Sequence, residues 1–410
     1  MSFNRKKNEI RDESSLTKAS QDKLNSSLFL FKALTGRLHL LAYGLPLFIF
    51  LFLLHHYITT RYHHLFPALT YYLYSTFFAF VITAVLTPIV MKIARKFNLL
   101  EYHTFPKEKK MPTPYIGGVA IYLTFLTVLC FYQPWTTQTK GILLGGTIIW
   151  IMGTIDDIRP LTSTLRLVGQ LIASGIVISS GLVVSFMPDT VWGNALALVI
   201  TTVWIIGIIN ATNFIDGVDG LATGCVVLAA GFFFLITLHL EQHSVAILAS
   251  ILAGCGLGFL IFNFAPSKII LGDGGSTFMG FVLACLALYG GWSNWGPIIA
   301  LGIPVLILGI LIFDVIYITI SRIKNGQVRT VRQWLDYHGH DHLHHRLMHM
   351  GFKEKEAVIF IYLIAIVLGL GALVIEHARV SYPVVLLLIQ ATLIFLIISI
   401  LMLVGRETTP

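Results

Sequence analysis

The chain has 410 residues, of which 56% are hydrophobic and only 12% charged, and its formal net charge is +8 at pH 7. This composition excludes an ordinary soluble globular protein, because such domains carry about 25% charged residues. The charge does not indicate nucleic-acid binding, since the basic residues lie beside apolar segments, where anionic lipid headgroups account for them, and no nucleic-acid-binding module accompanies them. The sequence therefore predicts a polytopic protein of the lipid bilayer.

Hydrophobic stretches recur along almost the whole chain. Residues 1–36 are rich in Ser, Lys, Asn and Asp, and we expect a disordered cytoplasmic tail there. An additional span and an outer loop are expected over 37–69, because the first apolar run begins too late for a signal peptide. Residues 70–405 are expected to form the core. The twelve stretches near bilayer length predict an all-α transmembrane bundle of 11–12 spans: 39–58, 70–92, 116–132, 141–154, 166–184, 195–212, 220–239, 246–263, 276–290, 297–321, 357–376 and 383–404.

The basic residues are distributed unevenly between the loops. If both termini are cytoplasmic, the outer loops carry only Arg61, Lys140 and Arg379 of the 28 Lys and Arg residues. This asymmetry is what the positive-inside rule requires. The same orientation places five polar clusters on the cytoplasmic face, namely 107–118, 154–159, 210–222, 268–276 and 338–346.

The first cluster contains Lys107, Lys109 and Lys110, which precede Thr113-Pro-Tyr-Ile-Gly-Gly at the start of the third stretch. Two explanations of these lysines are equally good: they contact the substrate, or they anchor the cytoplasmic end of the span.

The second cluster places Asp156 beside Asp157 at the end of the fourth stretch. Adjacent carboxylates raise each other's proton affinity unless a cation holds them. The alternative is a structural helix end in which the carboxylates pair with Arg159 and Arg166.

The third cluster has oxygen-bearing side chains at every third position. Asn210, Asn213, Asp216 and Asp219 lie near one face while the helix lasts, and glycines then weaken the helix. Such oxygen ligands suit Mg²⁺, which usually keeps waters and substrate phosphates in its shell. The alternative is a capped loop between two spans.

The fourth cluster, GDGGS at 272–276, opens the ninth stretch. Glycines ahead of a helix leave backbone N–H groups, including that of Gly274, free for phosphate. Asp273 would repel that phosphate unless a bridging Mg²⁺ made it a ligand. A plain turn is the alternative.

The fifth cluster is a basic loop with His338, His340, His342, His344 and His345, followed by Arg346. Histidines are common zinc ligands, but no cysteine lies near and an arginine follows, which favours contact with an anionic substrate. A solvated loop also remains open.

Carboxylates are costly in a membrane, so aspartates gathered at or beside the ends of hydrophobic segments indicate a site. We expect the clusters to converge on one polyanionic ligand and a metal ion.

The order DD, NxxNxxDGxDGLA, GDGGS and HLHHRL resembles the polyprenyl-phosphate N-acetylhexosamine-1-phosphate transferases. The resemblance runs from about Phe78 to Ala357. It is strongest to the branch that starts enterobacterial antigen, O antigen or teichoic acid synthesis. Peptidoglycan relatives that transfer phospho-MurNAc-pentapeptide have three consecutive histidines, whereas this chain has Leu343 between His342 and His344.

The resemblance implies transfer of N-acetylhexosamine 1-phosphate, by default GlcNAc-1-phosphate, from a UDP-sugar to undecaprenyl phosphate with release of UMP. It implies a Mg²⁺ ion, with Mn²⁺ as a substitute, and a location in the bacterial inner membrane. A homodimer is left open.

The resemblance also implies a role for each motif residue. Asp156 and Asp157 would position or deprotonate the lipid phosphate. Asp216, also expected to be catalytic, and Asp219 would hold the nucleotide and the metal site. Asp273 would bind Mg²⁺ with Asn213 as second ligand. His342, His344 and His345 would grip the diphosphate and the sugar. The expected substrate-binding residues are Lys110, Asn210, Asp219, Gly274 and Arg346.

An ion-coupled transporter is the main alternative of another class, because membrane aspartates also mark ion paths. A transporter predicts acidic residues near mid-span, whereas here they lie at one face.

Overall fold

The structure is a computed structural model that describes residues 68–101, 112–131, 135–290, 296–328, 342–378 and 381–404, with the single residues 292, 330 and 333. The predicted tail at 1–36, the predicted span at 39–58, Lys110, His338 and His340 lie outside the described residues.

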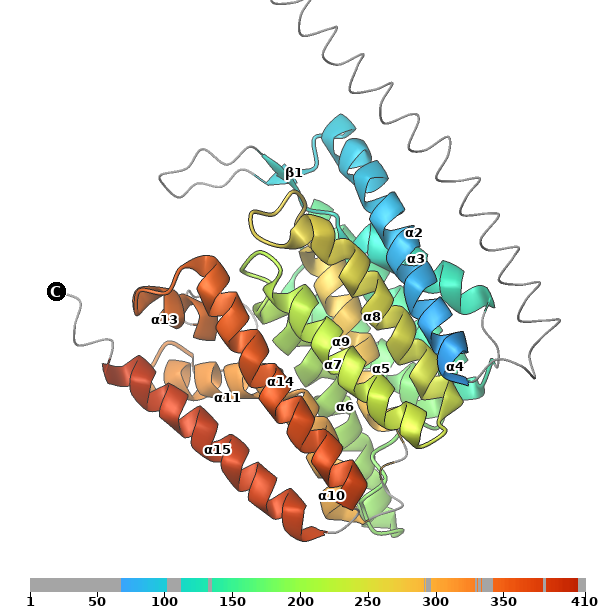
Figure 1. The fold of residues 1–410 in the computed structure, drawn as a ribbon, viewed down its shortest axis with the longest axis vertical. Coiled ribbons are helices and arrows are strands. Elements are labelled where there is room, and N and C mark those ends of the chain that lie inside the picture. The colour runs from blue at the N-terminus through green and yellow to red at the C-terminus, as the bar shows by residue number, and fades with distance from the viewer. Residues whose placement is uncertain are drawn as a thin grey trace, which may run out of the picture. The chain divides into compact units, whose positions relative to one another are not determined.

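The described chain is a bundle of helices, as predicted (Figure 1). One short antiparallel pair, β1 (Leu100–Glu101) with β2 (Thr113–Pro114), accompanies them. The helices are α2 (Ala68–Lys96), α3 (Gly118–Phe131), α4 (Thr137–Ile158), α5 (Ser163–Ser179), α6 (Val191–Phe214), α7 (Leu221–His239), α8 (His243–Asn263), α9 (Gly272–Tyr289), α10 (Pro297–Ile307), α11 (Gly309–Lys324), α13 (Leu343–His349), α14 (Glu354–Ala378) and α15 (Ser381–Val404).

Seven of the described helices are long and apolar enough to cross a membrane, or eight if one bent pair counts as a span. Many of their large apolar side chains are exposed, such as Val203 at 65% and Leu363 at 56%. Exposed side chains of this kind suit contact with lipid. The chain is therefore a multi-pass membrane protein.

The predicted stretch at 297–321 is helical but is not one continuous helix. Instead, α10 and α11 meet at Leu308 with a bend of 82°. Pro304 and Gly309 flank the break, and both residue types weaken a continuous helix because proline lacks an N–H and glycine is conformationally free. The bend turns α11 away from the direction of α10 (Figure 1).

Helix α9 lies at the centre of the bundle and contacts α3, α4, α6, α7 and α8. Its side chains from Phe278 to Leu286 are all buried. At Gly153 of α4, an added Cβ would lie 2.6 Å from the carbonyl oxygen of Asp273. The absence of a side chain there lets the end of α4 pack directly on the first turn of α9.

Candidate active site

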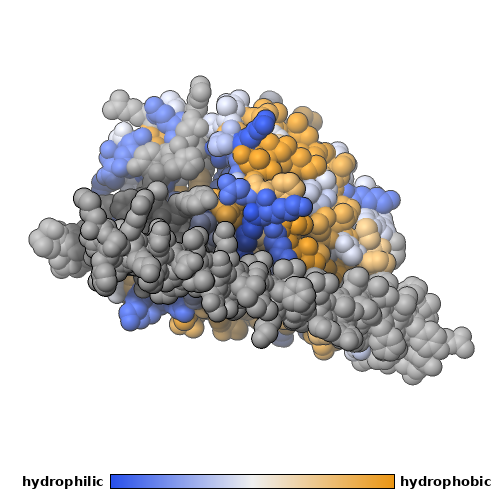
Figure 2. All heavy atoms as spheres, turned by 90° about the horizontal axis from the view of Figure 1, so that it is seen from above, coloured by the Kyte–Doolittle hydropathy of each residue, from blue (hydrophilic) through white to orange (hydrophobic). Residues whose placement is uncertain are grey.

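All five polar clusters contribute to one cavity of about 850 Å³. Figure 2, which shows the bundle from the end that is uppermost in Figure 1, has hydrophilic residues gathered beside a hydrophobic flank. The expected convergence of distant segments is thus confirmed for the described residues. The residues of the five clusters that line the cavity include Tyr115, Asp157, Asn210, Asn213, Asp216, Ile270, Asp273, His342, His344 and His345.

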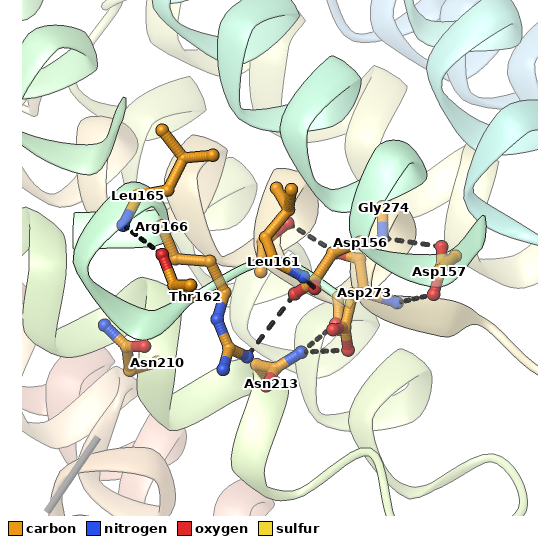
Figure 3. A network of polar contacts seen from close by, with 12 residues as sticks. Asp156, Asp157, Leu161, Thr162, Leu165, Arg166, Asn210, Asn213, Asp273 and Gly274 are labelled. Carbon is orange, nitrogen blue, oxygen red and sulfur yellow. Dashed lines mark hydrogen bonds and ion pairs between the residues drawn. The ribbon is translucent and has the colours of Figure 1, made fainter. Parts of the chain in front are cut away.

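The adjacent carboxylates Asp156 and Asp157 have different partners (Figure 3). Asp156 accepts a 2.6 Å hydrogen bond from the Leu161 N–H and pairs with Arg166 at 3.3 Å. Asp157 faces the cavity and accepts hydrogen bonds from the backbone N–H groups of Asp273 at 2.7 Å and Gly274 at 3.0 Å. Asp156 therefore pairs with an arginine, as in the structural alternative, whereas Asp157 lines the cavity.

The expectation that the GDGGS turn leaves its backbone N–H groups free is wrong for Asp273 and Gly274. Asp157 takes both, because a carboxylate is stabilised by the N–H groups and the dipole at a helix start. Gly272 makes this approach feasible, with φ at +75°. An added Cβ there would lie 2.3 Å from the Tyr115 carbonyl oxygen and 2.8 Å from a carboxylate oxygen of Asp157.

Asn213 lies next to Asp273 (Figure 3), and both residues line the same cavity. Its amide nitrogen donates to Asp273 Oδ1 at 2.8 Å and to Ser276 Oγ at 2.9 Å. The amide oxygen is the atom of Asn213 that can ligate a cation. Asn213 and Asp273, which the sequence analysis predicted as the two metal ligands, are therefore in direct contact.

Asp216 lies in the turn after α6 and faces the cavity. Burial raises the pKa of Asp216 well above its ordinary value, and the nearby carboxylates of Asp273 and Asp157 raise it further. A hard divalent cation among these oxygens would relieve the repulsion. The donor set of three carboxylates and one amide thus fits Mg²⁺.

Histidines at the start of α13 also line the cavity. The rings of His342 and His344 are stacked with centroids 5.7 Å apart, and those of His344 and His345 are 4.2 Å apart. Gly217 lies close to His344, since an added Cβ would be 3.3 Å from its Nε2. The imidazoles therefore share the cavity with the carboxylates.

Asp314 of α11 is a residue that the sequence analysis missed. It is 1% exposed, accepts a hydrogen bond from His342 Nδ1 at 2.9 Å and accepts another from the Leu343 N–H at 2.8 Å. The first contact directs His342 Nε2 away from α11, and the second caps α13. The available signal was a lone carboxylate inside an apolar run.

Replacing Asp314 by Asn is expected to lower kcat about 10²-fold, the scale found when a carboxylate that orients a histidine is changed. An asparagine keeps the size but can accept with one oxygen only, so His342 or Leu343 loses its partner. Steady-state kinetics with both substrates checks this, and an unchanged kcat would contradict the orienting role. Asp189→Asn, in the exposed loop before α6, is the control.

Four predicted substrate-binding residues have protein partners. Asn210 lines the cavity and donates to Gln170 at 3.0 Å, and the Gly274 N–H is held by Asp157. Asp219 accepts from the Ser267 N–H at 2.8 Å, while Arg346 donates to the hydroxyls of Tyr317 and Ser321 at 3.0 and 3.3 Å. Asp219 and Arg346 are not part of the cavity lining. Their substrate contacts stay predictions.

Comparison with known proteins adds an independent observation. Residues 139–291 match the model of glycosyl transferase family 4. A Bacillus subtilis protein named probable undecaprenyl-phosphate N-acetylglucosaminyl 1-phosphate transferase is 30% identical over 332 residues, covering 80% of this chain and 91% of the relative. The chain belongs to glycosyl transferase family 4. The family predicted from the four motifs is thereby confirmed.

Two further relatives carry related names. A Mycobacterium leprae decaprenyl-phosphate N-acetylglucosaminephosphotransferase is 29% identical over 335 residues, with 72% of this chain and 81% of the relative covered. A Geobacillus thermodenitrificans phospho-N-acetylmuramoyl-pentapeptide-transferase is 30% identical over 238 residues, covering 51% of this chain and 72% of the relative. The similarity to the first two relatives thus extends over more of this chain than that to the third.

Proposed function

We propose that this protein transfers GlcNAc 1-phosphate from UDP-GlcNAc to undecaprenyl phosphate at the cytoplasmic face, releasing UMP. The observation that carries the proposal is a single cavity that Asp157, Asp216 and Asp273 line together with His342, His344 and His345. The relatives with the longest overlap reported above carry names of polyprenyl-phosphate N-acetylglucosamine 1-phosphate transferases. The product would start a cell-envelope polysaccharide such as O antigen or teichoic acid.

The reaction brings two phosphorylated substrates together. An oxygen of the lipid phosphate attacks the β-phosphorus of the UDP-sugar, a new pyrophosphate bond forms, and the bond between the β-phosphorus and the bridging oxygen breaks. UMP leaves with that oxygen. One pyrophosphate linkage replaces another, so the reaction needs no ATP.

The residues of the cavity fit the charges of this reaction. Asp273 and Asn213 would hold Mg²⁺, which supplies positive charge to the diphosphate when bound. His342, His344 and His345 bind the diphosphate oxygens. Asp157, fixed by two backbone N–H groups, positions the lipid phosphate or takes its proton, with Asp216 beside it.

A lipid-borne acceptor suits the position of the cavity beside α5. Ser163, Arg166, Leu167 and Gln170 of this helix line the cavity. Other side chains of α5 are exposed and apolar, including Leu165 at 50% and Ile172 at 52%. A phosphate anchored in the bilayer can therefore reach the cavity along α5.

The test combines purified protein, Mg²⁺, undecaprenyl phosphate and radiolabelled UDP-GlcNAc. We expect a butanol-extractable product and stoichiometric UMP, loss of both in EDTA, and recovery with excess Mg²⁺ or Mn²⁺. Turnover that is indifferent to chelation would contradict the metal assignment. UDP-GalNAc and UDP-MurNAc-pentapeptide are the matched alternative donors, and preference for either one would overturn the choice of sugar.

A further inference from the structure

A second cluster of metal-ligating side chains lies outside the catalytic cavity. His239 ends α7, and Glu376 and His377 lie in the last turn of α14. The catalytic cavity is at the other end of α7, whose 19 residues span roughly 28 Å at 1.5 Å per residue. Because α7 and α14 pack against each other, the two helix ends meet (Figure 1).

The ligand atoms of the three side chains converge. Glu376 Oε2 is 2.9 Å from His377 Nδ1, and Glu376 Oε1 is 3.7 Å from His239 Nε2. The two imidazole rings are stacked with centroids 5.0 Å apart, and all three ligand atoms lie within 4.8 Å of one another. Atoms around a tetrahedral zinc ion lie roughly 3.3 Å apart, so small side-chain rotations suffice to close such a site.

The electrostatics of this place also favour a cation. Glu376 is 0% exposed, and a buried carboxylate is costly without a positive partner. Two helices end here, and each contributes partial negative charge from its last carbonyl groups. His239 and His377 are 52% and 70% exposed, which leaves a path for an ion and for a water ligand.

We propose that His239, Glu376 and His377 form a binding site for a divalent transition-metal ion, typified by Zn²⁺, that joins the ends of α7 and α14. Two imidazoles and one carboxylate are ligands suited to zinc, and the fourth position faces solvent. Because the site lies at the other end of α7 from the cavity, the ion stabilises the helix pair and takes no part in the transfer reaction.

The test uses full-length protein in detergent, purified without a histidine tag and stripped with a chelator. Zinc is added, and the metal retained per chain is measured by mass spectrometry after gel filtration. The wild type is expected to retain one more Zn²⁺ than His239→Gln or His377→Gln, with an affinity difference above about 100-fold, since even residues that merely orient a ligand change affinity 10–100-fold. His243→Gln, an exposed histidine at the adjoining start of α8, is the matched control.

Thermal unfolding provides a second readout, because an ion that binds only the folded state raises the unfolding temperature. Zinc should raise it in the wild type and in His243→Gln but not in the two cluster variants. Equal zinc retention and equal thermal shifts in all four proteins would overturn the proposal. Such a result would leave Glu376 as the hydrogen-bonding or ion-pair partner of the two histidines, and it would not affect the proposed transferase function.

Discussion

Replacing Asp273 by Asn is expected to lower turnover at least about 10³-fold while the protein still folds, because the site loses one negative charge that would hold the proposed metal ion. Asparagine has the same size, and its amide can still contact Asn213, which lies 2.8 Å away in the wild type. The radiolabel assay measures turnover, and gel filtration in detergent reports folding.

The matched control for Asp273→Asn is Asp189→Asn, which makes the same chemical change at an exposed position. It should retain wild-type turnover. A similar rate for Asp273→Asn would remove this residue from the mechanism.

Replacing Asp157 by Asn is expected to have a comparable effect on turnover through a different cause. The Asp157 carboxylate accepts from two backbone N–H groups at the start of α9, and an asparagine can accept with only one oxygen. The variant therefore loses both a charge in the cavity and part of a helix cap, the latter typically worth about 1 kcal/mol. Kinetics and thermal unfolding measure the two losses separately.

Asp156→Asn provides the closest comparison, because the neighbouring carboxylate is engaged by Arg166 and the Leu161 N–H. Its turnover should fall by a smaller factor than that of Asp157→Asn. Equal losses in the two variants would mean that the pair acts as a unit, contrary to the different partners seen here.

The helices after residue 70 were predictable because long apolar runs report directly on contact with lipid and with other helices. The predicted number of spans, 11–12, exceeds the seven or eight described helices that are long and apolar enough to cross a membrane. Each of the eleven predicted stretches after residue 70 corresponds to a described helix or to the α10–α11 pair. The bend at Leu308 was not predictable in the same way. The hydropathy of the segment is the same whether Pro304 kinks the helix, breaks it or lies in a continuous helix. The stretches at 141–154 and 276–290 became longer helices because their polar motifs continue the helical backbone.

The residue types of the site were predictable, but the direction of each side chain was not. Asp156 and Asp157 are neighbours on a helix and therefore point about 100° apart, so one reaches Arg166 and the other the cavity. Arg346 follows His345 directly but is drawn to Tyr317, over whose ring its guanidinium lies at 4.8 Å. The partner of each side chain depends on which helices pack beside it, and a local sequence pattern does not specify that packing.

We propose that Asp273 and Asn213 would hold a divalent ion close to the diphosphate of the donor. Manganese tests this directly, because Mn²⁺ is paramagnetic and its electron–nuclear double resonance spectrum detects coordinated phosphate. With UDP-GlcNAc bound, we expect a ³¹P coupling in the wild type and in Asp189→Asn that is lost in Asp273→Asn. A wild-type spectrum without ³¹P coupling, or an unchanged coupling in Asp273→Asn, would contradict the account.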